Sequence, residues 1–154
     1  MEFYSVMKID ETDLKILGIL KENAKMTTSK ISKIIRIPVT TIHNRIKKLQ
    51  NEGVIKNYTI NLDHKKLGKH IYAIILINTR YVLIKDEDKN RESVAKTIKK
   101  LDGVEEVCRV TGINDFLVRV RKENIDELNN FLIDKLRKVS GVEKTQTLIV
   151  LNND

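Results

Sequence analysis

Two segments, KKLDGVEEV (99–107) and RKVSGVEKT (137–145), repeat one pattern and decide the fold of the larger part of this chain. Each runs basic, basic, apolar, any residue and then Gly-Val-Glu, and the two glycines, Gly103 and Gly141, stand 38 residues apart. An apolar spacing typical of a helix precedes each copy, and an apolar strand pattern follows it. The repeat therefore predicts two helix-turn-strand units.

Two further apolar stretches complete this half of the chain. HIYAIILINT (70–79) precedes the first unit and FLVRV (116–120) lies between the two, so the predicted order is β-α-β-β-α-β. The predicted strands inside the units are EVCRV (106–110) and TLIVL (147–151). The helical positions are Val94, Ile98 and Leu101 in the first unit and Ile125, Leu128, Leu132 and Leu136 in the second. This order is that of a ferredoxin-like sandwich, an α+β architecture.

The strand over 71–77 is apolar on both faces. Ile71, Ala73, Ile75 and Ile77 alternate with Tyr72, Ile74 and Leu76. With both helices on one face of the sheet, the other face would meet water, where a strand should carry polar residues. At about 25 cal/mol per Å2 of apolar surface, leaving several such side chains wet would cost several kcal/mol. We therefore expect a second subunit to cover this face in a two-fold homodimer.

The first part of the chain shows three helical patterns. IDETDLKILGILKEN (9–23) places Leu14, Leu17 and Leu20 on one face, and MTTSKISKII (26–35) places Ile31, Ile34 and Ile35 inward. Thr27, Thr28 or Ser29 is the expected N-cap of the second helix. Pro38, the only proline, follows a short break and favours a new helix from Val39 to about Asn51, which Gly53 ends. A short helix, a tight turn and a second helix form a helix-turn-helix pattern.

The third helix, within PVTTIHNRIKKLQNEGVI (38–55), has one narrow apolar stripe of Ile42, Ile46 and Leu49. Its remaining surface carries no acid before Glu52. Such a surface suits the major groove of DNA, where amides and cations reach base edges and hydroxyls reach phosphates. The candidate DNA-binding residues are Thr40, Thr41, His43, Asn44, Arg45, Lys47 and Lys48. The alternative for each single residue is an ordinary solvated helix surface.

The charge distribution agrees with a polyanionic partner. The chain carries a net charge of +8, and residues 1–66 hold 13 Lys and Arg against 7 Asp and Glu, whereas residues 67–154 hold 16 against 14. A charge excess that serves solubility alone is the competing explanation. With 5% aromatic residues the chain offers no stacking platform for single-stranded nucleic acid.

The motifs resemble the leucine-responsive regulatory protein/AsnC family of prokaryotic transcription regulators. The resemblance rests on IDETDLKIL (9–17) and on the block of Arg45, Ile46, Leu49 and GVI (53–55), and it extends to the end of the chain. It implies a winged-helix-like DNA-binding domain over 1–53, an extended linker over 54–68 and a dimerisation and effector-sensing domain over 69–154. Family members form dimers that often assemble further, commonly to octamers. Arg36 replaces the family's usual turn glycine, so this turn must accept a strained backbone or differ in shape.

The segment VTGINDF (110–116) contains the candidate effector residues Thr111, Gly112, Asn114 and Asp115. From the residues alone an ordinary hairpin turn is the stronger interpretation. The alternative is a small-molecule site in which Thr111 and Gly112 hold a carboxylate while Asn114 and Asp115 hold an ammonium. The resemblance favours that alternative, because a Thr-Gly-x-x-Asp loop is the family's effector region, and it implies an amino acid as effector.

Other functional classes have little support. We find no Gly-rich phosphate loop, no metal-ligand spacing and no nucleophile with a base, and we expect no enzymatic activity and no cofactor. KDEDKN (85–90) is expected to be a solvated loop, because it lacks the calcium-loop spacing. The single cysteine, Cys108, is expected to be half-buried in a strand. The chain lacks a signal-peptide pattern and an apolar segment of membrane-spanning length, so we expect a cytoplasmic protein.

The sequence thus predicts a sequence-specific DNA-binding transcription regulator that is a dimer or larger and responds to an amino acid. The alternative is an amino-acid-sensing regulatory subunit in which the basic head contacts another protein. The charge asymmetry and the acid-free helix face favour DNA. Retention on duplex DNA or heparin at low salt would separate the two hypotheses.

Overall fold

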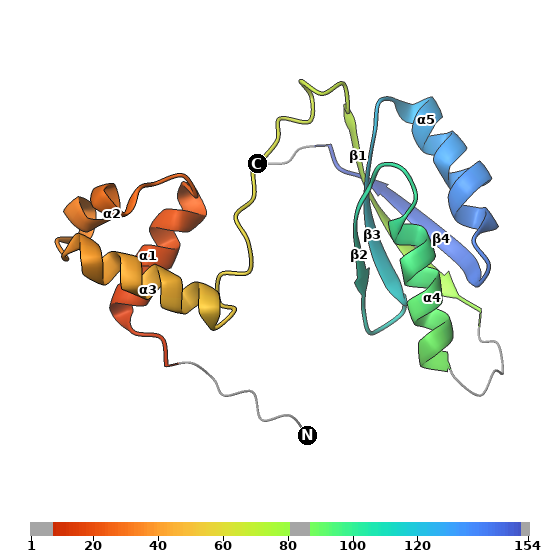
Figure 1. Ribbon diagram of the computed structural model, residues 1–154. Coiled ribbons are helices and arrows are strands. Elements are labelled where there is room, and N and C mark those ends of the chain that lie inside the picture. The colour runs from red at the N-terminus through yellow and green to blue at the C-terminus, as the bar shows by residue number, and fades with distance from the viewer. Residues whose placement is uncertain (1–7, 81–86, 152–154) are drawn as a thin grey trace. The chain divides into compact units, whose positions relative to one another are not determined.

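The computed structural model describes residues 8–80 and 87–151 of the chain, which divides into two compact units. One unit extends to Asn61 and the other begins at Leu62. Figure 1 shows the first unit as helices only and the second as a sheet with helices. Each unit has its own hydrophobic core. The predicted limits of the two domains and the linker stay a prediction.

The first unit contains α1 (Glu11–Glu22), α2 (Thr28–Ile35) and α3 (Val39–Asn51), as the three helical patterns predicted. Asp10 caps α1 and Thr27 caps α2, the latter being one of the three predicted N-caps. The core consists of fully or nearly fully buried aliphatic side chains from all three helices: Ile16, Leu20, Ile31, Ile42 and Leu49. Burial of Ile42 and Leu49, with Ile46 half-buried, confirms the predicted inner stripe of α3.

Two predicted inward positions are wrong. Leu14 is 60% exposed and Ile34 is 56% exposed. In α1 the buried side chains are those of Asp13, Ile16 and Leu20, a stripe rotated by one residue from the predicted leucine face. Asp13, a carboxylate in the first turn of α1, is buried on this stripe, whereas Leu14 is not.

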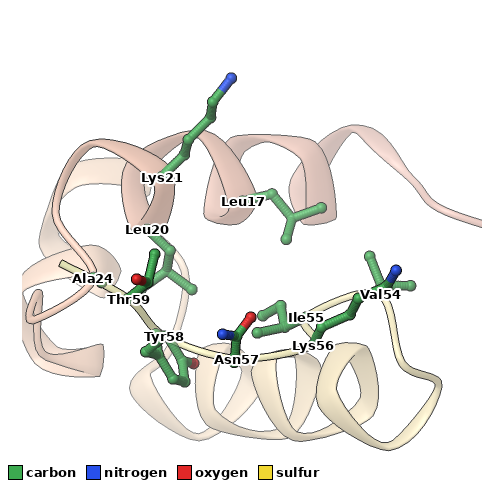
Figure 2. Close-up of a pocket in the computed structure, with 10 residues that line it drawn as sticks. All are labelled: Leu17, Leu20, Lys21, Ala24, Val54, Ile55, Lys56, Asn57, Tyr58 and Thr59. Carbon is green, nitrogen blue, oxygen red and sulfur yellow. The ribbon is translucent and has the colours of Figure 1, made fainter. Parts of the chain in front are cut away.

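The chain after α3 returns alongside α1. Val54 and Ile55 pack against the helical core, and an apolar cavity of about 390 Å3 lies between this segment and α1. Figure 2 shows Leu17 and Leu20 pointing from α1 toward residues 54–59, while Lys21 points away from them. The residues predicted to begin the linker therefore lie against the helical unit.

The second unit has the predicted β-α-β-β-α-β order. Its elements are β1 (Ile71–Thr79), α4 (Glu87–Lys99), β2 (Val104–Arg109), β3 (Phe116–Lys122), α5 (Ile125–Asn130) and β4 (Val142–Ile149). All neighbouring strands pair antiparallel in the sheet order β2-β3-β1-β4, which is the ferredoxin-like arrangement. Figure 1 shows α4 and α5 on the same side of the sheet. The core between them buries Ile75 of β1, Val118 of β3, Ile98 of α4 and Phe131 after α5.

Several details differ from the sequence prediction. β4 begins at Val142, five residues earlier than predicted, because its backbone pairs with β1 through the polar positions as well. α5 gives way to a π-helical turn (Phe131–Lys135) and a 3-10 turn (Leu136–Lys138), and Ile125 is exposed rather than inward. Part of the charged segment 85–90 lies outside the described residues, but residues 87–90 form the first turn of α4 and are not a loop.

The sheet face opposite the helices is the apolar surface predicted from β1. On β1 its side chains are Tyr72, Ile74 and Leu76, all half-buried in one chain, while Ala73, Ile75 and Ile77 are buried under the helices. Leu76 pairs with Leu117 of β3, and Ile74 pairs with Leu148 of β4. We call this surface the open sheet face. Cys108, half-buried as predicted, lies on the same face opposite Leu117.

Candidate nucleic-acid interface and effector loop

Helix α3 begins at Val39, directly after its N-cap residue Pro38, whose backbone is not helical (φ −52°, ψ 140°). The Pro38 carbonyl accepts the first helical hydrogen bond, from the Ile42 backbone N–H at 3.1 Å. No side chain caps this terminus, so several backbone N–H groups of the first turn remain available to an anion. Thr40 and Thr41 lie at this terminus, where a DNA phosphate would find hydroxyl and amide donors.

Arg36 adopts the left-handed conformation in the turn between α2 and α3. Its φ is 58° and its ψ is 45°, and it is the only non-glycine residue with positive φ in the described part of the chain. The strained-backbone alternative from the sequence is therefore the one that the structure adopts. The turn keeps the shape that glycine would give, and it places the Arg36 side chain at the surface beside α3.

Most of the predicted DNA-binding side chains lie on one exposed surface. Thr40, His43, Asn44, Lys47 and Lys48 are exposed, and Thr41 is half-buried. We call this set, with Thr41, the α3 outer face. It contains no carboxylate, because no Asp or Glu occurs in Val39–Asn51. The structure thus brings these six predicted residues together on one helix.

Arg45 has a different environment from the one predicted. Its Nη1 donates to Asp10 Oδ2 at 2.6 Å and to Asp13 Oδ1 at 2.8 Å, so the guanidinium is bound to the start of α1. The Arg45 side chain is 31% exposed. Hydrogen bonds to Asp13 and Asp10 raise the pKa of Arg45. The backbone N–H of Asp13 and then the Arg45 guanidinium hold the pKa of Asp10 below its usual range.

A polar hollow of about 370 Å3 lies between the start of α1 and α3. Its lining combines Thr41, Asn44 and Lys48 of the α3 outer face with Arg45 and with three residues that the sequence did not single out, Lys8, Asp10 and Asp13. Lys8 was missed because it precedes the first helical pattern. Asp10 and Asp13 were missed because nothing in the local pattern indicates an arginine partner 32 or more residues away.

In the second unit, the four predicted effector residues line one small cavity. It measures about 280 Å3 and is lined by Arg91, Arg109, Val110, Thr111, Gly112, Asn114 and Asp115. The loop is held to the end of β1, since Asn78 Nδ2 donates to the Ile113 carbonyl at 2.6 Å and the Asp115 backbone N–H donates to the Ile77 carbonyl at 2.9 Å. A polar cavity with two guanidinium groups suits a ligand that carries a carboxylate.

Asp115 already has partners within the chain. Its Oδ2 accepts from the Thr79 backbone N–H at 2.7 Å and from Thr79 Oγ1 at 2.9 Å, and its Oδ1 lies 3.3 Å from Arg91 Nη2. Neither Arg91 nor Arg109 was predicted as a site residue from the sequence. Arg109 stands two residues before Thr111 and was within reach of a sequence argument, whereas Arg91 comes from another element, α4.

Every helix within residues 8–80 and 87–151 is too short or too polar to span a lipid bilayer.

Comparison with known proteins agrees with both halves of this description. Residues 9–56 match the family model for a winged helix-turn-helix DNA-binding domain, and residues 79–153 match that for the Lrp/AsnC ligand binding domain. The chain is 39% identical over 143 residues to the HTH-type transcriptional regulator FL11 of Pyrococcus horikoshii, which covers 93% of this chain and 89% of FL11.

Solved structures show the same architecture over nearly the whole chain. The complex of the transcriptional regulator NMB0573 of Neisseria meningitidis with L-Met superposes with a TM-score of 0.86 at 26% identity, covering 94% of this chain and 91% of that one. AsnC of E. coli superposes with a TM-score of 0.83 at 30% identity, covering 96% of this chain and 95% of its own.

Proposed function

The chain belongs to the Lrp/AsnC family of DNA-binding transcriptional regulators, and we propose that it reads duplex DNA through the α3 outer face. The family is one of regulators and not of enzymes. The observation that carries the proposal is that six of the seven predicted DNA-binding residues share one acid-free surface of a helix whose other side packs into the core through Ile42 and Leu49. Such a helix fits the major groove and presents its polar side chains to base edges and phosphates.

The side chains divide by their chemistry. The Asn44 amide can donate to and accept from an adenine edge, so it is proposed to read sequence. Lys47 and Lys48 are proposed to neutralise phosphates, and Thr40 and Thr41 to bind phosphate at the uncapped helix terminus. His43, which is exposed, is proposed as a hydrogen-bonding residue at the rim. With duplex DNA as its proposed partner, the protein is proposed to act on the chromosome in the cytoplasm.

Two substitutions test this division. Asn44→Ala is expected to lower affinity for a duplex enriched by the wild-type protein by about ten-fold or more, while affinity for a random duplex changes little. Lys48→Ala is expected to weaken both duplexes alike and to reduce the slope of log affinity against log salt by about 0.9 for each bound head, or about 1.8 for the proposed dimer. Band-shift titrations over a salt series measure both effects. Unchanged affinity in both variants would refute the assignment of the α3 outer face.

We further propose a homodimer formed through the open sheet face. The apolar side chains Tyr72, Ile74, Leu76 and Leu117 give this face a surface that a second copy would bury. Charged side chains share this face, because Arg119 stands opposite Ile74 and pairs with Glu106 at 2.8 Å, and Arg121 stacks on Tyr72 at 4.2 Å from the ring centroid. Two helix-turn-helix heads in a dimer would bind two half-sites of a palindrome. Light scattering at micromolar concentration distinguishes a monomer, a dimer and an octamer.

The proposed effector is an amino acid bound at the loop 110–116. Thr111, the Gly112 backbone and the nearby arginines offer donors to a carboxylate, and the Asn114 carbonyl offers an acceptor to the ammonium. The Asp115 oxygens already bind Thr79 and Arg91, so Asp115 would bind the ammonium only through lone pairs that these contacts leave over. Calorimetric titration with each common amino acid tests the proposal. Heat of binding for at least one is expected, and its absence for all would reject amino-acid sensing while leaving DNA binding intact.

A further inference from the structure

Arg45 connects the recognition helix to the first turn of α1 through two carboxylates. A single nitrogen, Nη1, lies 2.6 Å from Asp10 Oδ2 and 2.8 Å from Asp13 Oδ1. The Asp13 side chain is 7% exposed and that of Asp10 is 50% exposed, so one of the two pairs is largely shielded from water. A charged pair of this kind is both stronger and more directional than an exposed one.

The carboxylates themselves are held rigidly by the helix terminus. Asp10 Oδ1 accepts from the Asp13 backbone N–H at 2.9 Å, and Asp13 Oδ2 accepts from the Asp10 backbone N–H at 3.2 Å, which is a reciprocal capping box. Each carboxylate therefore uses one oxygen for the end of α1 and its other oxygen for Arg45. All four oxygens are engaged, and the guanidinium is fixed to a terminus that cannot rotate independently of α1.

We propose that Arg45 is a positioning residue, and that the Asp10–Asp13–Arg45 clamp sets the rotation of α3 about its own axis against α1. Arg45 directly follows Asn44 in the chain and lies one turn before Lys48, and all three line the same hollow. A change in the rotation of α3 would move Asn44 away from its base edge before it moved the helix out of the groove. The clamp thus serves sequence discrimination, and this inference rests on the proposed function of the α3 outer face.

The clamp and simple electrostatics predict opposite changes in DNA affinity when a carboxylate is removed. Removal of a negative charge beside a DNA-binding surface should strengthen binding to any duplex. If the carboxylates act by orienting α3, their removal should instead weaken binding to the enriched duplex, because the geometry that selects it is lost.

The first experiment compares Asp13→Asn with Glu11→Gln in the full chain. Glu11 is a matched control, because it lies in the same helical turn and pairs with Lys15 at 2.7 Å within α1. We expect Asp13→Asn to reduce affinity for the duplex enriched by the wild-type protein by about ten-fold, as befits loss of a charge-assisted hydrogen bond, with less than about two-fold loss on a random duplex. Glu11→Gln should leave both affinities unchanged or slightly higher. Tighter binding of both duplexes by Asp13→Asn would overturn the proposal.

A second variant guards against a simple loss of folding. Asp10→Asn keeps an excellent N-cap residue, while an amide NH2 group, which cannot accept from Arg45, replaces the charged oxygen that faces it. It should retain the far-UV circular dichroism of the wild-type protein and still lose discrimination between the two duplexes. Full discrimination in a folded Asp10→Asn variant would count against the clamp.

A double-mutant cycle separates positioning from direct DNA contact. If Arg45 acts through the carboxylates, Arg45→Met added to Asp13→Asn should lower affinity little further. If Arg45 binds DNA directly, the two losses should multiply, and Arg45→Met alone should reduce the salt slope by about 0.9 for each bound head. Multiplying losses with a reduced slope would overturn the proposal. A wild-type protein that enriches no duplex would instead refute the proposed function on which the inference rests.

Discussion

Replacing Gly103 by alanine is expected to destabilise the second unit far more than the same change at Gly68. Both glycines lie in this unit with nearly the same left-handed backbone, φ 79° at Gly103 and φ 75° at Gly68. A Cβ at Gly68 would meet nothing within 4 Å, whereas a Cβ at Gly103 would lie 2.6 Å from the Arg121 backbone oxygen and 2.9 Å from Lys122 Nζ. The pair therefore separates the conformational penalty from the steric one.

The magnitude follows from these two contributions. Left-handed backbone costs alanine about 1–2 kcal/mol, which the smaller entropy of its unfolded chain offsets by about 0.4–1 kcal/mol. Gly68→Ala should thus lose about 1 kcal/mol. At Gly103 the added methyl group must move the backbone of β3, whose Arg121 N–H donates to the Gly103 carbonyl at 2.9 Å. Overpacking of this kind costs about 1–3 kcal/mol more, so Gly103→Ala should lose about 3 kcal/mol in all.

The steric contribution also reaches a buried charge. Lys122 is 5% exposed, and its Nζ donates to the Asp102 backbone oxygen at 2.8 Å and to Asp102 Oδ2 at 3.1 Å. A methyl group at residue 103 would also press against this ammonium, but the end of a lysine side chain shifts more cheaply than backbone does. The contact with the Arg121 backbone oxygen therefore sets the estimate for Gly103→Ala.

Differential scanning calorimetry of the full chain measures the difference. For a unit of this size, 1 kcal/mol corresponds to about 4–8 °C in the melting temperature of its transition. Gly68→Ala should lower the transition by about that amount, and Gly103→Ala by at least about twice as much. Equal shifts in the two variants would refute the steric argument and the close approach of the turn to β3.

Three further predictions concern the turn before α3, the capped helix terminus and the open sheet face. Arg36→Gly should stabilise the first unit by about 0.5–1 kcal/mol, because glycine relieves the left-handed strain at φ 58°, and a lower melting temperature in thermal unfolding would contradict this. The pKa of Asp10 is lowered in the folded state, so its contribution is present above its unfolded pKa and is lost as the pH falls through the folded value. Urea midpoints measured from about pH 5 to pH 2 should therefore fall less steeply in Asp10→Asn than in the wild-type protein, and identical slopes would exclude the effect. Leu76→Glu should shift the protein toward monomer in light scattering, because it places a charge in the proposed interface, whereas Lys99→Glu on exposed α4 should not. An unchanged mass for Leu76→Glu would argue against the open sheet face as the interface.

The sequence contained enough information for the order of elements, because each element is encoded locally. The Gly-Val-Glu repeat and the alternation in 71–77 predicted the β-α-β-β-α-β unit, and the inner stripe of Ile42, Ile46 and Leu49 predicted the orientation of α3. Inward-facing positions of α1 and α2 were less accessible. A helical spacing accommodates Leu14 or Ile34 on either side of a stripe, and only the neighbouring helices decide which side is buried.

The sites were predictable where their residues are contiguous and not where two elements combine. Thr111, Gly112, Asn114 and Asp115 come from one loop and line one cavity, whereas Arg91 joins them from α4. In the same way, the residues of the α3 outer face were predictable because they all lie on one helix. The pairing of Arg45 with Asp13 and the burial of Asp13 depend on how α1 and α3 pack, and the pattern of one helix does not encode either.

Selection of duplexes from a random pool by the wild-type protein tests most directly whether the α3 outer face reads DNA sequence. The acid-free α3 outer face, presented twice by a symmetric dimer, predicts enrichment of a palindromic sequence whose binding weakens steeply as salt is raised. Absence of any enriched sequence, with no retention of the protein on duplex DNA even at low salt, would contradict the central claim.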